Sequence, residues 1–187
     1  MRVSGSVGSP AADKRERHYL ERMRHHGEKY KEFHRPSVEL LVNLIHTYDV
    51  IYTRLAREVE RDGLSVAAFN MLTILSRCGR EGCPMHELGE LLLVSRANIT
   101  GLVGCLERRG LVERAVSRED RRVRLVRLTK AGGRLLEKIL PRHYSGVRDA
   151  LEGMSDRSKA DLSKLLTRLR RAALQTSKRS MRRTIDR

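Results

Sequence analysis

The chain has no tryptophan, and aromatic residues make up only 4% of its 187 residues. Hydrophobic residues make up 40%, so the core must consist mainly of leucine, valine, isoleucine and alanine. Because bulky aromatic residues favour strands, their scarcity favours a helical protein. The length suits one domain, or one domain with an extension.

Long hydrophobic runs are also missing. No stretch approaches the ~20 apolar residues that a membrane-spanning helix needs. The first twenty residues, MRVSGSVGSPAADKRERHYL, lack the apolar centre of a secretory signal peptide. We therefore expect a cytoplasmic protein with no membrane partner.

Motifs typical of catalysis are absent as well. The sequence contains no phosphate-binding loop, no zinc-protease motif and no serine in a nucleophile elbow. Four of the seven histidines lie within residues 13–35, namely His18, His25, His26 and His34. A metal sensor is one interpretation, but no pair of ligands stands out at helical spacing, so a solvated helix is favoured. We expect no enzyme activity, no cofactor and no metal.

Cysteine is scarce. Cys78, Cys83 and Cys105 are odd in number and lack the spacing of metal ligands. In a reducing compartment this favours small thiols that are buried or half-buried. Cys78 and Cys83 lie five residues apart across a glycine-containing loop, so a redox disulfide between them is the alternative.

Positive charge, in contrast, is in large excess. The formal net charge is +16, which attracts polyanions, with DNA, RNA and anionic lipid as the candidates. Between Ser95 and Lys130, ten lysines and arginines oppose four acids and leave a net charge of +6. The charge is therefore concentrated in a segment that also shows helix and strand patterns.

Hydrophobic spacing divides the chain into helices and one hairpin. A helix is predicted from Val38 to about Glu60, after a break at Pro36-Ser37, and a second from Ser65 to about Cys78-Gly79. The later elements are expected to be a helix at 85–92, a tight turn at 93–94, a helix at 96–109 capped by Ser95 and closed by Gly110, strands at 111–116 and 123–128, a helix opened by Thr129 and kinked at Pro141, and a last helix from about Ser155.

Helix, tight turn, capped helix and hairpin form, in this order, a winged helix-turn-helix. On the capped helix, arginine can bind a guanine edge, asparagine an adenine edge, and threonine a phosphate or a thymine methyl. Arginines at the hairpin tip can enter the narrow minor groove of DNA. A solvated basic hairpin with no ligand is the alternative. The candidate DNA-binding residues are Ser95, Arg96, Asn98, Thr100, Gly101, Arg118, Asp120, Arg121, Arg122 and Arg124.

Three details of the hairpin need an explanation. Asp120 is unusual in a basic patch, and we expect it to pair with Arg122 or another hairpin arginine and fix its direction. Arg124 and Arg127 are expected to meet phosphates or to cover the adjacent helix. Because apolar residues fall on both faces of the strand at 123–128, either both faces are partly covered or a bulge intervenes.

The chain resembles the MarR family of bacterial transcriptional regulators over about residues 38–174. The resemblance is carried by "HELGELLLVSRANITGLVGCLERRGLVER" (86–114) and by "REDRRVRLVRLTKAG" (118–132), which contains Asp120, Arg122, Leu128 and Thr129 of the wing motif. It implies a homodimer whose first and last two helices form a dimerisation base. The expected dimer contacts are Leu41, Ile45, Leu162, Leu165, Leu166 and Leu169.

The resemblance further implies a regulator, more often a repressor, that binds a pseudo-palindromic promoter site in nucleoid DNA. A phenolic or other aromatic effector would bind between the first, second and fifth helices, near His46, Tyr48, Tyr52 and Phe69, although simple core packing is the alternative for each of these residues. Peroxide sensing of the family's type is not expected, because the cysteines lie elsewhere. The competing function is a chromatin-type protein that coats nucleic acid without sequence choice.

The predicted fold is therefore mainly α with a small β-hairpin wing, in which a winged helix-turn-helix lobe joins a helical dimerisation base. The expected segments are a disordered tail (1–12), an extra N-terminal helix (13–35), helical dimerisation regions (36–62 and 130–175), the winged lobe (63–129) and a basic tail (176–187).

Overall fold

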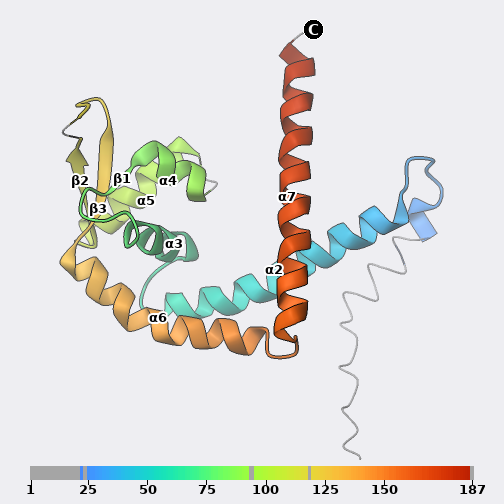
Figure 1. Ribbon diagram of the computed structural model, residues 1–187, viewed down its shortest axis with the longest axis horizontal. Helices are drawn as coiled ribbons and strands as arrows, with labels where there is room; N and C mark the ends of the chain where they lie inside the picture. Colours follow the sequence, from blue (N-terminus) through green and yellow to red (C-terminus); the bar gives the residue numbers. More distant parts are fainter. Residues whose placement is uncertain (1–21, 23–24, 93–94, 118, 186–187) are drawn as a thin grey trace, which may run out of the picture. The chain divides into compact units, whose positions relative to one another are not determined.

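The structure is a computed structural model that describes residues 22, 25–92, 95–117 and 119–185 (Figure 1). It divides into two compact units, Met1–Leu140 and Pro141–Arg187. The elements in chain order are α2 (Arg35–Glu60), α3 (Val66–Leu75), β1 (Cys83–Pro84), α4 (Met85–Leu92), α5 (Arg96–Arg108), β2 (Val112–Val116), β3 (Arg124–Leu128), α6 (Lys130–Ala150) and α7 (Asp156–Ile185). The predicted class, mainly α with a small β wing, is confirmed.

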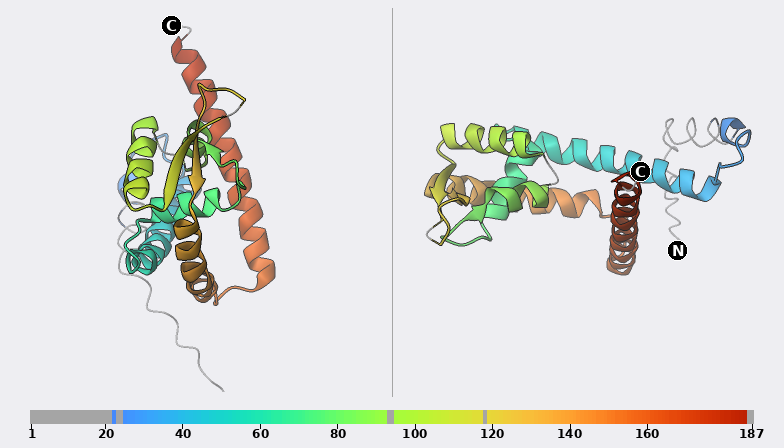
Figure 2. Two further views of the ribbon diagram at one scale, coloured as in Figure 1. Left: turned by 90° about the vertical axis from the view of Figure 1, so that its left-hand side faces the viewer. Right: turned by 90° about the horizontal axis from the view of Figure 1, so that it is seen from above.

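The core of the first unit is aliphatic, as the composition predicts. It brings together helices α3, α4 and α5, the sheet and the start of α6, which lie beside one another in Figures 1 and 2. Met71, Leu72, Leu88, Val103 and Leu106 are fully buried. Because a side chain of this size stabilises the fold by about 1.5–3 kcal/mol when buried, this cluster is enough to hold the small unit together.

Side-chain caps fix where the helices begin. Ser65 accepts a hydrogen bond from the backbone N–H of Ala68 at 3.2 Å and opens α3. Thr129 opens α6 by accepting from the N–H of Gly132 at 3.0 Å, and its hydroxyl donates to the carbonyl of Gly110 at 2.7 Å. Ser155 accepts from the N–H of Ser158 at 3.1 Å ahead of α7. The caps at Ser65 and Thr129 follow the sequence prediction, which gave Ser155 only as the approximate start of the last helix.

The sheet contains a strand that the sequence analysis missed. Its order is β1-β3-β2, and both pairings are antiparallel. β1, expected to be part of a loop, pairs Cys83 with Val126, so β3 is the central strand. Leu125 and Val126 are both buried although they point to opposite faces, so both faces of β3 are covered at these positions. The register between β2 and β3 is continuous, so the covered-faces alternative holds and the bulge is not needed.

Helix α2 begins earlier than predicted. Pro36 lies in its first turn rather than in a break before it, because a proline there has no N–H to leave unpaired. The residue before the helix, His34, makes no side-chain cap, although its Nδ1 lies 2.7 Å from Ser37 Oγ. Val59 is the one buried residue of α2. α3 ends at Leu75, three residues before the predicted end.

The second unit contains the end of α6 and the long helix α7. α6 continues as a helix through Pro141 up to Ala150. α7 extends to Ile185, so the basic segment that begins at residue 176 continues the helix instead of forming a separate frayed tail. In the described ranges, no single helix is long and apolar enough to cross a membrane.

Most of the predicted N-terminal segments lie outside the described residues. This holds for the tail at 1–12 and for 11 of the 23 residues of the expected helix at 13–35, and the tight turn at 93–94 also lies outside them. Of the predicted extra helix, residues 25–27 are helical and are followed by turns up to residue 32.

Gly132 is expected to be essential for packing, because a Cβ at this position would meet the carbonyl oxygen of Leu111 and lie 2.8 Å from Leu128 Cδ1. Gly132→Ala should therefore lower the free energy of unfolding by about 1–3 kcal/mol. Gly133→Ala is the matched control, since its Cβ would lie 4.0 Å from Leu128 Cδ2, an ordinary contact. The control should be about 0.5–1 kcal/mol more stable than the wild type. Urea unfolding of both variants measures the difference, and equal stabilities would contradict the close approach.

Candidate nucleic-acid interface

One side of α5 anchors the helix to the core. Ile99, Val103 and Leu106 are buried, and Leu102 is half-buried against the same cluster. These positions follow helical spacing, so the opposite side must face away from the core. α4 supports this arrangement through Leu88, which is fully buried.

The start of α5 is set by Ser95. Its backbone is extended, with φ −65° and ψ 159°, and its hydroxyl accepts from the N–H of Asn98 at 3.3 Å. The helix ends at Arg108, and Gly110 follows with φ +67°, a conformation that glycine adopts without strain. Both ends of α5 thus confirm the predicted boundaries to within one residue.

The outer side of α5 carries small and polar residues. Ala97, Asn98, Thr100 and Gly101 are exposed, and a Cβ at Gly101 would have no neighbour within 4 Å. An asparagine amide can bind the edge of adenine in two places, while the small neighbours let the helix backbone come close to a duplex. The side chain of Arg96 lies outside the described residues. Cys105 is also exposed on α5, which the sequence analysis did not anticipate.

The hairpin tip is a turn held by its own side chains. Ser117 Oγ accepts from the N–H groups of Glu119, at 3.2 Å, and Asp120, at 3.4 Å. The Ser117 N–H donates to the carbonyl of Val123 at 3.1 Å, and the Val123 N–H donates to the carbonyl of Asp120 at 3.0 Å. These bonds hold the backbone from which the tip arginines extend.

Asp120 takes a role different from the predicted one. Its Oδ1 accepts from the backbone N–H of Arg122 at 2.8 Å, and no ion pair between Asp120 and a described arginine is found. An aspartate side chain that bonds the backbone two residues later makes a turn of its own. The carboxylate therefore fixes the course of the tip and leaves the guanidinium of Arg122 exposed.

The basic residues of this region separate into two groups. Arg121, Arg122 and Arg124 are exposed at and beside the tip, whereas the side chain of Arg118 is not described. A second group binds other parts of the same unit and consists of Arg109, Arg114 and Arg127.

These three arginines brace the unit. Arg109 donates to the carbonyl of Gly63 at 2.6 Å, and Arg114 pairs with Glu107 at 2.6 Å. Arg127 Nε donates to the carbonyl of Glu81 at 3.1 Å, and its Nη2 lies 3.5 Å from the Glu81 carboxylate. The expectation that Arg127 meets phosphates or covers a helix is thus wrong: Arg127 ties β3 to the loop before β1.

The four predicted effector-pocket residues differ in burial. Phe69 is buried in the core, and His46 is half-buried on α2. Tyr48 and Tyr52 stack on each other, with ring centroids 5.2 Å apart, but both are exposed. Core packing is therefore the better account of Phe69.

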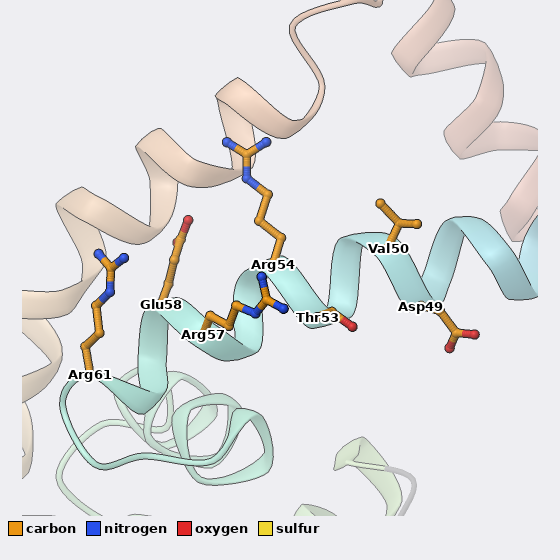
Figure 3. Close-up of a pocket in the computed structure, with 7 residues that line it drawn as sticks. All are labelled: Asp49, Val50, Thr53, Arg54, Arg57, Glu58 and Arg61. Atoms are coloured by element: carbon orange, nitrogen blue, oxygen red, sulfur yellow. The ribbon is translucent and has the colours of Figure 1, made fainter. Parts of the chain in front are cut away.

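A cleft of about 600 Å³ lies along the second half of α2. Arg54, Glu58 and Arg61 extend on the same side of the helix (Figure 3). The cleft offers three guanidinium groups and so could hold an anionic molecule. Its lining residues are Asp49, Val50, Thr53, Arg54, Arg57, Glu58 and Arg61.

No metal site was found in the described part of the chain. No group of three or more histidine, cysteine, aspartate or glutamate side chains there is able to hold an ion. Of the histidines weighed as metal ligands, His18 lies outside the described residues.

Comparison with known proteins identifies similar chains. The model of the MarR family matches residues 62–123. The transcriptional repressor YetL of Bacillus subtilis is 31% identical over 141 residues, which are 75% of this chain and 84% of YetL.

Among solved structures, the DNA complex of Sco3205, a MarR family regulator from Streptomyces coelicolor, has a TM-score of 0.70 and 22% identity. The match covers 76% of this chain and 91% of that one. CouR from Rhodococcus jostii RHA1, bound to p-coumaroyl-CoA, has a TM-score of 0.64 and 25% identity, covering 71% and 92%.

Ser95→Ala should lower the free energy of unfolding by about 0.5–2 kcal/mol, because the N–H of Asn98 loses its hydroxyl acceptor. Ser95→Gly should cost only a few tenths of a kcal/mol. Urea unfolding followed by circular dichroism measures both. If the alanine variant were as stable as the wild type, the cap would not hold the start of α5.

Proposed function

Because the chain belongs to the MarR family of transcriptional regulators, we propose that it binds a pseudo-palindromic promoter site as a homodimer and represses transcription. The observation that carries this proposal is the outer side of α5, which is capped at its start, exposed and flanked by a basic hairpin. The repressor function named for YetL, at 31% identity, supports it. Members of the family are regulators of transcription and not enzymes.

The start of α5 enters the major groove in this proposal. Ser95, Arg96, Asn98, Thr100 and Gly101 face the bases and the adjacent phosphates. Asn98 selects adenine with its amide, and Thr100 contacts a phosphate or a thymine methyl. The DNA-bound structure of the similar regulator Sco3205 supports a duplex as the ligand.

The hairpin places its exposed arginines in the neighbouring minor groove. Arg121 and Arg122 are exposed at the tip, and Arg124 follows at the start of β3. Arg118 precedes them in the sequence and is proposed as a further contact. The minor groove attracts arginine because its narrow walls concentrate the negative potential of the phosphates. Asp120 contributes indirectly, since its bond to the N–H of Arg122 holds the turn.

Two copies pair through α2 and α7. These helices carry exposed leucines and isoleucines that one chain does not bury, among them Leu41 and Leu165, which are 56% and 58% exposed. An exposed apolar surface of this kind marks a protein interface. The proposed contacts are Leu41 and Ile45 on α2 and Leu162, Leu165, Leu166 and Leu169 on α7.

A small anionic, aromatic effector binds α2 in the same proposal. Its anionic group enters the cleft near Arg54, Arg57 and Arg61, and its ring packs on the Tyr48–Tyr52 stack. The binding of p-coumaroyl-CoA by CouR supports a ligand of this chemistry. His46 lies one half-turn before Tyr48 on the same helix, whereas Phe69 takes no part.

A regulator binds one DNA sequence more tightly than random DNA, whereas a protein that coats nucleic acid does not, so this preference distinguishes the two functions. Sequencing the DNA that crosslinks to the protein identifies a candidate site, and competition against random DNA at physiological salt then measures the preference. A regulator should prefer its own site by at least ~10³. A ratio near one on every tested promoter would support the chromatin-type alternative instead.

Arg122→Ala should weaken binding to that site by about 1–3 kcal/mol, because it removes an exposed cation from the hairpin tip. Arg127→Ala is the matched control, since it removes an equal charge from the same hairpin where the guanidinium binds Glu81. Fluorescence anisotropy measures both affinities, and thermal melting checks that each variant is folded. An unchanged affinity for the Arg122 variant would remove the wing from the mechanism.

Replacing Leu165 and Leu169 together by aspartate should give monomers that no longer bind the site, because two carboxylates would enter the apolar dimer contact. Lys164→Asp with Arg168→Asp is the control, as these exposed neighbours have the same i, i+4 spacing. Analytical ultracentrifugation measures the oligomeric state. Dimers that persist in the leucine variant would place the interface elsewhere.

A further inference from the structure

Two of the three cysteines are in contact although nothing proposed above uses them. Cys78 follows the end of α3, and Cys83 is the first residue of β1. The side chains of Cys78 and Cys83 lie close enough to affect each other, and the Cys83 thiol also lies 4.0 Å from Glu87 Oε2. Cys83 is buried and Cys78 is half-buried, so the pair is reached from solvent through Cys78.

The loop between the two cysteines has the conformation that brings them together. Gly79 and Gly82 have φ angles of +66° and +85°, which glycine adopts without strain. The chain therefore reverses direction within four residues. The Cys78 thiol also donates to the carbonyl of Ile74 at 3.3 Å, which holds its sulfur at the end of α3.

We propose that Cys78 and Cys83 form a reversible disulfide, and that this bond weakens DNA binding through the wing. The second half of this statement rests on the proposed function, whereas the first half does not. The oxidant is a hydroperoxide. The thiol pair differs from Cys105, which is exposed on α5 and has no cysteine partner among the described residues.

The reaction proceeds in two steps. The Cys78 sulfur attacks one peroxide oxygen, the O–O bond breaks, and Cys78 becomes a sulfenic acid while water or an alcohol leaves. The Cys83 sulfur then attacks the Cys78 sulfur, a second water leaves, and the S–S bond forms. Two thiols lose two protons and two electrons in total, and a dithiol reductant returns both thiols.

The assignment of Cys78 as the first sulfur follows from its surroundings. Burial, with a smaller effect of the Cys78 hydrogen bond, raises the pKa of the Cys83 thiol to about 12. Cys83 is therefore the less reactive of the two thiols toward peroxide. Cys78 is the more accessible sulfur, and once it is a sulfenic acid, the nearby Cys83 thiol attacks it and gives up its proton to the leaving water.

The loop between the cysteines is attached to the central strand of the wing. Cys83 pairs with Val126, and Gly82 approaches the carbonyl of Val126 so closely that a Cβ would not fit. Arg127 binds Glu81 from the same strand. A disulfide of about 2.05 Å draws the sulfurs well inside hydrogen-bond distance. The resulting shift of β1 and Glu81 is transmitted to β3, which leads back to the tip arginines.

Intact mass of the full-length protein tests the bond itself. After hydrogen peroxide treatment, the wild type and Cys105→Ser should each lose 2 Da (two hydrogens), and Cys78→Ser and Cys83→Ala should not. Trypsin cuts after Arg80, so the expected product is peptide 78–80 linked to peptide 81–96. A wild type that keeps both thiols while Cys105 is oxidised, or a bond that maps to Cys105, would overturn the proposal.

DNA binding on the site found by crosslinking tests the consequence. The affinity of oxidised wild type should fall at least ~10-fold and return with dithiothreitol, whereas reduced and oxidant-treated Cys78→Ser should bind equally. If the 2 Da loss occurs and the affinity does not change, the link to the wing is refuted. If reduced wild type binds no site, the proposed function fails, and the mass measurement still decides the disulfide.

Discussion

The position of β3 between β1 and β2 is the constraint on which the winged lobe depends. β3 is paired on both edges, and Leu125 and Val126, which point to opposite faces of the strand, are both buried. The strand begins directly after the arginine-rich tip and ends at Leu128, just before Thr129, the cap of α6. Core packing therefore fixes both the place from which the wing extends and the place where the next helix starts.

Charge in this region has two separate uses. Arg109, Arg114 and Arg127 bind carbonyls and carboxylates of the unit itself, so their guanidinium groups act in the fold. Those contacts are partly exposed, and exposed ion pairs contribute only about 0–1 kcal/mol each. Their geometric effect is greater, since Arg109 and Arg127 each join segments that are 46 residues apart in the sequence, and Arg114 joins β2 to α5. A net charge of +6 between Ser95 and Lys130 thus overstates the charge that is available to a ligand.

Sequence patterns predicted the local features and missed the distant ones. The caps at Ser65, Ser95 and Thr129 could be predicted because a cap involves residues only three positions apart. β1 has two residues and pairs with a strand more than forty residues later, so neither periodicity nor length marks it. The contact of Arg127 with Glu81 was missed for the same reason, since the two residues are also far apart in the sequence.

In the candidate site, too, some features could be predicted from the sequence and others could not. Which residues of α5 face outward followed from helical spacing, because the buried positions are apolar. Asp120 was expected to pair with a hairpin arginine, whereas in the described residues its carboxylate binds the backbone N–H of Arg122. An aspartate beside arginines can bind either a guanidinium or a backbone N–H, and only the course of the turn decides between them. On α2 the aromatic residues alone could not indicate a pocket. The cleft of α2 is lined instead by arginines and carboxylates, residue types that also occur on any solvated helix.

The winged lobe and the helices proposed for dimerisation also differ in how much of their apolar surface is buried within one chain. The core around Leu72, Leu88 and Leu106 is complete within one chain, whereas α2 buries a single residue and α7 exposes its leucines. A lobe that folds on its own core can bind a half-site, but a single half-site gives little preference over random DNA. Joining two lobes turns the second contact into an intramolecular step and multiplies the preference. In the proposed mechanism, therefore, the exposed leucines determine how strongly the hairpin arginines bind, although they touch no DNA.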